Sequence, residues 1–169
     1  KLSKSFLAEA FADPKHHDCN TAVVLITTKI IDKHGLIRRL VDRLENPAAV
    51  VDFERRVIVR RLEVHFIDPA MFLHIIEQCV REAQRIALGP IAKKSESERR
   101  DQGFRIRLAI DNWTLIQDTY PEIAADKRLL PALLMMLRRE GIGTLIIANE
   151  DPGFSQDLRL RQSQALRDL

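Results

Sequence analysis

Residues 21–27 constrain the fold more than any other part of this sequence. They read TAVVLIT, so β-branched and apolar residues follow one another without polar alternation. A strand with one face in water alternates apolar and polar side chains, whereas a strand buried on both faces does not. A second run, residues 104–116 (FRIRLAIDNWTLI), is apolar from Leu108 to Ile110 and then stops at Asp111. Strands of this kind indicate a sheet that is covered on both faces.

Segments with helical spacing separate the expected strands. Helices are expected over residues 4–12, 30–44 and 69–83, and around 129–139, where Gly141 ends the last one. One or two strands are expected within 55–68 and another over 143–150, whereas the charged segment 89–103 predicts a loop. This alternation predicts an α/β three-layer sandwich with a mainly parallel sheet. Residues 1–150 would form this core, and 151–169 a polar, helical tail.

Composition bounds the class of protein. The 169 residues suit one domain, and 27 basic against 24 acidic residues give a net charge of only +3. Two cysteines make no disulfide framework, which favours a reducing, cytoplasmic location. With neither a signal peptide nor a run of transmembrane length, no membrane partner is expected. The chain begins at Lys1 rather than Met, so a processed or partial chain is also expected.

Asp111 is the first candidate for chemistry. In parallel sheets, ligands bind beyond the carboxyl ends of the strands, and Asp111 ends an apolar strand. A carboxylate fixed there can hold Mg²⁺, a hard ion that prefers oxygen ligands. Buried strands also end in Asp for turn chemistry, so this feature alone leaves both interpretations open.

The amino end supplies the second candidate. The chain begins KLSKSFLAEAFA, with Lys4 and Ser5 immediately before an apolar helix. A phosphate-binding loop reads G-x-x-x-x-G-K-[ST] and opens into a helix. With Lys4 and Ser5 aligned to its lysine and hydroxyl residue, Ser3 takes the position of its last glycine. The alternative is an ordinary helix amino terminus capped by serine.

Taken in order, these segments resemble the RecA-like P-loop ATPases, and more closely their KaiC-like branch. The order begins with Lys-Ser, followed by a helix, a strand, a helix and a further strand. The helical segment 69–83 comes next, and after it come the strand ending in Asp111, another helix and a strand ending in Asn149 and Glu150. RRLEVHFIDPAMFLHIIEQCVREAQ is similar to the family's segment before its magnesium strand, and LAIDNWTLI to that strand. LLPALLMMLRREGIGTLIIANE is similar to the following helix and sensor strand. The resemblance spans about residues 4–150.

The resemblance implies roles by position. ATP and Mg²⁺ would be the cofactors: Ser3 and Lys4 would lie against the phosphates, with Ser5 and Asp111 holding the metal. Asn149 and Glu150 would sense the γ-phosphate, and subunits would assemble into homo-oligomers.

One departure from the family bears on hydrolysis. The family places a catalytic glutamate at the end of the strand after the first helix, where this chain has Thr27, Thr28 and Lys29. A lysine cannot act as that base, so hydrolysis is expected to be weak or absent, and the catalytic residue is unknown.

A scaffold of the same fold is the alternative function. It would bind protein or nucleic acid through Arg-rich loops or the tail, and Lys29 and the missing glycines favour it. Acidic residues interrupt the Arg pairs and aromatic residues are few, so the sequence does not support nucleic-acid binding. A receiver domain is excluded, because its Asp would precede its Thr and Lys.

Three further patterns have structural interpretations. The cluster HHDC (residues 16–19) predicts a solvated turn, and Trp113 is expected to pack under a loop. Met135 and Met136, with their leucine neighbours, are expected in the core.

Overall fold

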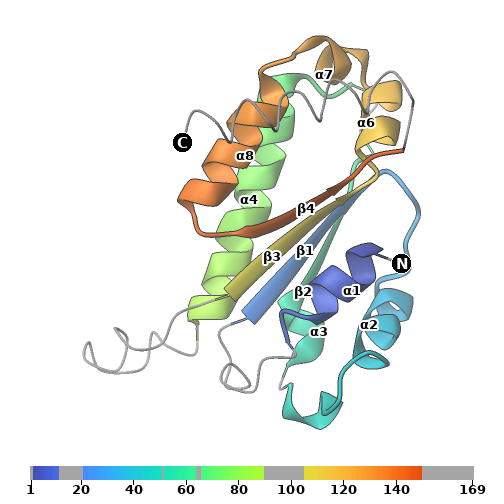
Figure 1. The fold of residues 1–169 in the computed structure, drawn as a ribbon, viewed down its shortest axis with the longest axis vertical. Helices are drawn as coiled ribbons and strands as arrows, with labels where there is room; N and C mark the ends of the chain where they lie inside the picture. Colours follow the sequence, from blue (N-terminus) through green and yellow to red (C-terminus); the bar gives the residue numbers. More distant parts are fainter. Residues whose placement is uncertain (1, 12–20, 51, 64–65, 90–104, 150–169) are drawn as a thin grey trace.

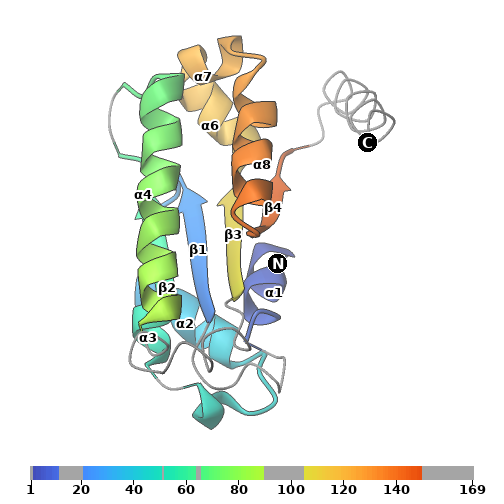
Figure 2. The same cartoon turned by 90° about the vertical axis from the view of Figure 1, so that its left-hand side faces the viewer.

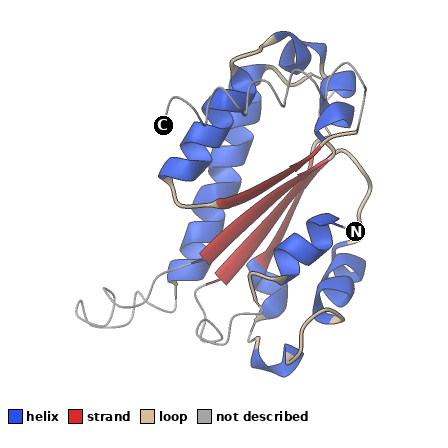
Figure 3. Cartoon of the chain, in the orientation of Figure 1, coloured by secondary structure: helices blue, strands red, loops and turns tan. Residues whose placement is uncertain are grey.

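The chain folds around one parallel sheet (Figures 1 and 3). The computed structural model describes residues 2–11, 21–50, 52–63, 66–89 and 105–149. Within these ranges the strands are β1 (Thr21–Thr27), β2 (Val57–Arg61), β3 (Arg105–Asp111) and β4 (Gly143–Ile147). Their order is β2-β1-β3-β4, and every neighbouring pair is parallel. The expected α/β class with a parallel sheet is therefore confirmed.

Helices lie on both faces of the sheet. They are α1 (Leu2–Ala8), α2 (Lys33–Val41), the 3₁₀ turn η2 (Pro47–Ala49), α3 (Phe53–Arg56), α4 (Pro69–Leu88), α6 (Trp113–Thr119), α7 (Pro121–Ala125) and α8 (Leu129–Arg139). Asp32 and Asp68 cap α2 and α4 by accepting backbone N–H groups of their first turns. Of the helices in the described ranges, none combines the length and apolar content needed to cross a membrane.

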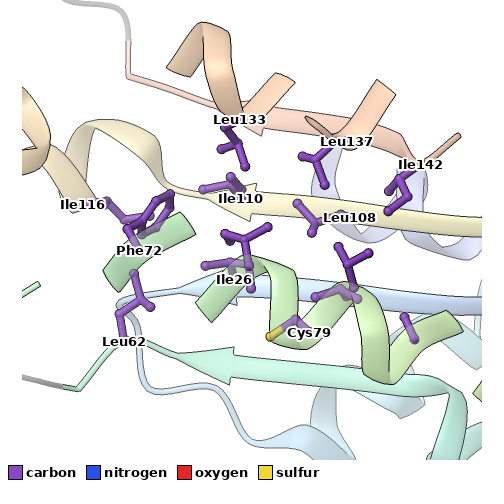
Figure 4. Close-up of a cluster of buried hydrophobic side chains, with 14 of the residues drawn as sticks. Ile26, Leu62, Phe72, Cys79, Leu108, Ile110, Ile116, Leu133, Leu137 and Ile142 are labelled. Atoms are coloured by element: carbon purple, nitrogen blue, oxygen red, sulfur yellow. The ribbon is translucent and has the colours of Figure 1, made fainter. Parts of the chain in front are cut away.

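Alternate residues of β1 enter two separate cores, which explains the unbroken apolar run. Ala22, Val24 and Ile26 pack in the core covered by α4 and α8, part of which is shown in Figure 4. Val23 and Leu25 pack in a second core with residues of α1 and α2. Figure 2 shows α4 and α8 on one side of the sheet and α1 and α2 on the other. The arrangement is that of a three-layer sandwich.

Several local expectations differ from the structure. Segment 55–68 contributes the end of α3 and then one strand of five residues, β2, whose last residues Arg60 and Arg61 are exposed. Helices α6 and α7 follow Asp111 directly and were not predicted. The expectation that Met135 is a core residue is wrong, because its side chain is 72% exposed.

The physical reason for the error at Met135 is that α8 meets the sheet along one stripe. Leu133 and Leu137, four residues apart, fill that stripe and are buried. The expected solvated turn at 16–19 and the expected tail at 151–169 lie outside the described residues, as does all but the first residue of the expected loop at 89–103.

Candidate functional site

Asp111 lies at the carboxyl end of β3, as the sequence predicted. Because β1 and β3 are parallel neighbours with Ile26 opposite Ile110, the residues after β1 reach the same edge of the sheet. There the Lys29 ammonium nitrogen lies 3.7 Å from Asp111 Oδ1. The Asp111 side chain is 25% exposed and that of Lys29 is 55% exposed. This edge therefore presents a partly accessible carboxylate with a cation beside it.

Helix α1 supplies the second partner of Asp111. Its Ser3 hydroxyl, which is buried, donates a hydrogen bond of 3.0 Å to Asp111 Oδ2. Arg107 of β3 fastens the same helix by donating to the Phe6 carbonyl oxygen at 2.8 Å. Ser3 therefore orients the carboxylate and leaves Oδ1 on the side of Lys29.

Ser5 and Asp111 were expected to hold a metal together. The hydrogen bond that the structure describes at Asp111 comes from Ser3 instead. The Ser5 hydroxyl accepts a hydrogen bond of 3.3 Å from Nε of Arg43, which lies in the turn after α2. Ser3 and Ser5 are two residues apart on a helix, which directs their side chains to different sides. Ser3 is therefore a serine of α1 that contacts Asp111 directly, at 3.0 Å.

Cations gather around Lys4, the expected phosphate ligand. Partial burial lowers the pKa of Lys4, and the nearby charges of Arg39 and Arg43 lower it further, while Asp111 acts in the opposite direction. The charges of two guanidinium groups and of the Asp111 carboxylate therefore act on Lys4. An anion placed here would relieve the repulsion among the three cations.

Asn149 reaches the same edge from β4. Its side-chain oxygen accepts a hydrogen bond from Asn112 Nδ2, and its backbone N–H donates to Thr114 Oγ1 at 2.9 Å. Asn112, which follows Asp111 through a cis peptide bond, also caps α6 by accepting from the Leu115 N–H. The ends of β3 and β4 are thereby tied together beside Asp111. Glu150 lies outside the described residues.

Two buried polar atoms at this edge have no hydrogen-bond partner within the described ranges. They are the Thr28 hydroxyl, directly before Lys29, and the Trp113 indole N–H, two residues after Asp111. A buried polar atom without a partner costs roughly 1–3 kcal/mol. Trp113 is otherwise a core residue that packs edge-on against Phe72, with ring centroids 5.8 Å apart.

The donor atoms suit Mg²⁺ held jointly with a ligand. The part of the chain that the structure describes holds no group of three or more His, Cys, Asp or Glu side chains that could bind a metal ion. The Asp111 carboxylate offers a hard oxygen atom, and Mg²⁺ is commonly held by one or two carboxylates together with substrate phosphates. These residues fit a metal that arrives with a polyphosphate.

Two hollows in the structure lie away from this edge. A shallow one of about 450 Å³ is lined by α8 and the start of β4, including Leu134, Ile142 and Gly143. A smaller one of about 170 Å³ lies between α4 and α8. The larger adjoins the amino end of β4, opposite the carboxyl edge, and its lining is mainly apolar. Neither matches a polyphosphate, so the chemistry points to the edge at Asp111.

The sequence analysis did not identify Asn112, Arg39 or Arg43. Asn112 had a readable signal, since an Asx residue between a strand and a helix often caps the helix. Arg39 lies in α2 and Arg43 in the turn that follows it, and only the packing of this segment beside α1 brings their charges near Lys4.

The fold and site define an α/β protein with a carboxylate at the carboxyl edge of a parallel sheet. Comparisons with protein-family models, curated proteins and solved structures found no match to this chain.

Proposed function

We propose that this chain is a RecA-like domain of the KaiC-like kind that binds Mg·ATP at the carboxyl edge of its sheet. The observation that carries the proposal is the position of Asp111, which the buried strand β3 delivers to that edge and the Ser3 hydroxyl orients. Asp111 would hold the metal through Oδ1, while Ser3 keeps the carboxylate in place through Oδ2. When bound, Mg²⁺ would neutralise charge on the phosphate oxygens.

The charges around Asp111 suit the phosphates. Besides burial, the charges of Arg39 and Arg43 lower the pKa of Lys4, and the Lys29 ammonium lies 3.7 Å from Asp111 Oδ1. A polyphosphate carries several negative charges and would pair with these cations. Lys4 therefore keeps the phosphate role that the sequence resemblance gave it.

Hydrolysis should be slow or absent. A general base must lie within hydrogen-bond reach of the attacking water. The end of β1 and the two positions after it, where the KaiC-like ATPases place a glutamate, hold Thr27, Thr28 and Lys29. A protonated lysine has no lone pair with which to accept a proton, so binding without rapid turnover is the expected activity.

Calorimetric titration with Mg·ATP tests the proposal. Asp111→Asn keeps the shape of the side chain and a hydrogen-bond acceptor for Ser3 but removes the charge, and we expect Mg·ATP to bind roughly tenfold to a hundredfold more weakly. Glu82→Gln, at an exposed position of α4, removes a carboxylate away from the edge and should bind like the wild type. Equal binding heats from the wild type and Asp111→Asn would refute the proposal.

A non-catalytic scaffold of the same fold is the second candidate function. It is favoured by the pairing of Lys29 with Asp111, because an ammonium beside the carboxylate neutralises the charge that a metal needs. Such a scaffold would bind protein or nucleic acid and would give no heat with Mg·ATP in the same titration. That outcome would favour the scaffold over the ATP-binding domain.

A further inference from the structure

We propose that Lys29 is a tethered counterion of Asp111, which makes metal binding at this carboxylate depend on a polyphosphate. The inference rests on the proposed function, since it concerns the regulation of the same site. It states that the site excludes free divalent cations and admits them together with phosphate.

Both carboxylate oxygens of Asp111 are engaged. Oδ2 accepts the Ser3 hydroxyl at 3.0 Å, and Oδ1 faces the Lys29 ammonium at 3.7 Å. Because Ser3 is buried, its side of the carboxylate is closed to solvent. A metal would approach Oδ1, where the ammonium lies.

The backbone of Lys29 is anchored while its side chain is exposed. Thr27, the last residue of β1, is fully buried, and its hydroxyl accepts the Lys29 N–H at 3.1 Å. The Lys29 side chain is 55% exposed and extends along a flexible four-carbon stem. The ammonium can therefore leave Oδ1 for another anion without disturbing the strand.

The charges explain why the metal and the polyphosphate should bind together. The Lys29 ammonium repels a divalent ion near Oδ1. The attraction of the single Asp111 carboxylate offsets only part of that repulsion. A polyphosphate offers Lys29 new acceptor oxygens, so the ammonium moves and Oδ1 becomes free. By linkage, the polyphosphate strengthens metal binding by the same factor as the metal strengthens polyphosphate binding.

Binding of Mn²⁺, measured by electron paramagnetic resonance without nucleotide, tests this inference. The wild type should bind Mn²⁺ weakly, and Lys29→Met about tenfold more tightly, because the charge that repels the divalent ion is gone. Lys29→Arg, which keeps the charge, should behave like the wild type. Lys29→Met combined with Asp111→Asn should lose the gain.

The matched control is Lys127→Met, which removes an exposed lysine between α7 and α8 and should leave Mn²⁺ binding unchanged. Lys29→Gln provides a second neutral variant, and thermal melting verifies that each variant is folded. A folded Lys29→Met or Lys29→Gln protein that binds Mn²⁺ no more tightly than the wild type would overturn the inference.

The two proposals fail in different measurements. If Mg·ATP binding needs Asp111 but the loss of Lys29 does not tighten Mn²⁺ binding, only the counterion role falls. If Lys29→Met gains a Mn²⁺ site that needs Asp111 while the wild type does not bind Mg·ATP, the counterion role of Lys29 is supported and the ATP-binding function is refuted.

Discussion

At the scale of single residues, Arg107 connects α1 to the sheet through three contacts. Its guanidinium donates to the Phe6 carbonyl and to Glu9 Oε2, each at 2.8 Å, and lies 4.8 Å from the centre of the Phe6 ring. Since α1 also carries Ser3, this arginine supports the partner of Asp111 from β3, the strand that carries Asp111 itself.

We expect Arg107→Met to lower the free energy of unfolding by about 1–2 kcal/mol, because it removes the hydrogen bonds to Phe6 and Glu9 and a cation–π contact. Glu9→Gln should cost less, under about 1 kcal/mol, because the Glu9 side chain is 63% exposed and solvent screens its ion pair. Urea unfolding of the three proteins measures both values. Equal losses in the two variants would show that the Glu9 ion pair, rather than the contacts to Phe6, accounts for the effect.

The sequence predicted some site residues better than others. The position of Asp111 could be predicted because the apolar run before it indicates a buried strand of a parallel sheet, whose carboxyl end lies at the edge. The sequence could not predict whether Ser3 or Ser5 contacts Asp111, because both lie at the start of the same helix. The packing of α1 on β3 is what brings the Ser3 hydroxyl to Asp111. Asn149 was expected at the edge and lies there, hydrogen-bonded to Asn112.

At the scale of secondary-structure elements, the end of α8 shows how one glycine sets the direction of the chain. Gly141 has φ of +68°, and its N–H donates to the Arg138 carbonyl. The Ile142 N–H donates to the Leu137 carbonyl at 2.9 Å, and both of these side chains are buried. This is a Schellman motif, in which the residue at positive φ is usually glycine.

Gly141→Ala should therefore lower the free energy of unfolding by about 1 kcal/mol, because a Cβ raises the energy of the left-handed conformation. Apart from the residues next to it in the chain, no atom of the described residues lies within 4 Å of that Cβ, so the loss comes from the backbone conformation rather than from packing. Gly141→Asn should lose less, since asparagine tolerates this conformation better. The control is Met135→Ala on the exposed side of α8, which should change stability by less than about 0.5 kcal/mol. Thermal or urea unfolding measures all three, and an unchanged Gly141→Ala protein would contradict the prediction.

The elements that were predicted are those with a long apolar pattern. The expected β1, α4 and α8 were confirmed because burial on one or both faces leaves a regular spacing. Helices α6 and α7 were missed because they have only seven and five residues, too few to show a period. The bounds of strand β2 were not predicted, because its five residues pass from buried to exposed and show no regular apolar pattern.

At the scale of the whole molecule, the order of the strands decides which residues meet. The order β2-β1-β3-β4 places β1 beside β3 and so brings Lys29 to Asp111. The sequence of an apolar strand that is buried on both faces does not indicate which strands pair with it. The order of the strands could therefore not be predicted from the sequence. It predicted the parallel direction, because helices separate the strands, and hence the edge at which chemistry is expected.

The stability of the molecule should fall in alkaline solution through Cys79. This thiol is buried in the core under α4, and burial raises its pKa above the ordinary value of 9.0, an effect that nearby Arg60 only partly offsets. The folded state thus holds its proton at pH values where the unfolded chain has released it. Stability from this group is complete below about pH 9 and is lost as the pH rises through the higher folded-state pKa.

We expect the free energy of unfolding to fall by up to about 1.4 kcal/mol per pH unit in this window because of Cys79. Urea unfolding between pH 8 and pH 10, with reductant and in a Cys19→Ser background, measures the slope. Cys79→Ala should be less stable at every pH, because it leaves a small cavity, but its slope should be shallower. Burial also raises the pKa of Tyr120, but Tyr120 is common to both proteins, so its effect cancels in the difference. Parallel slopes for the two proteins would mean that the thiol ionises equally easily in the folded and unfolded chain, contrary to its burial in the core.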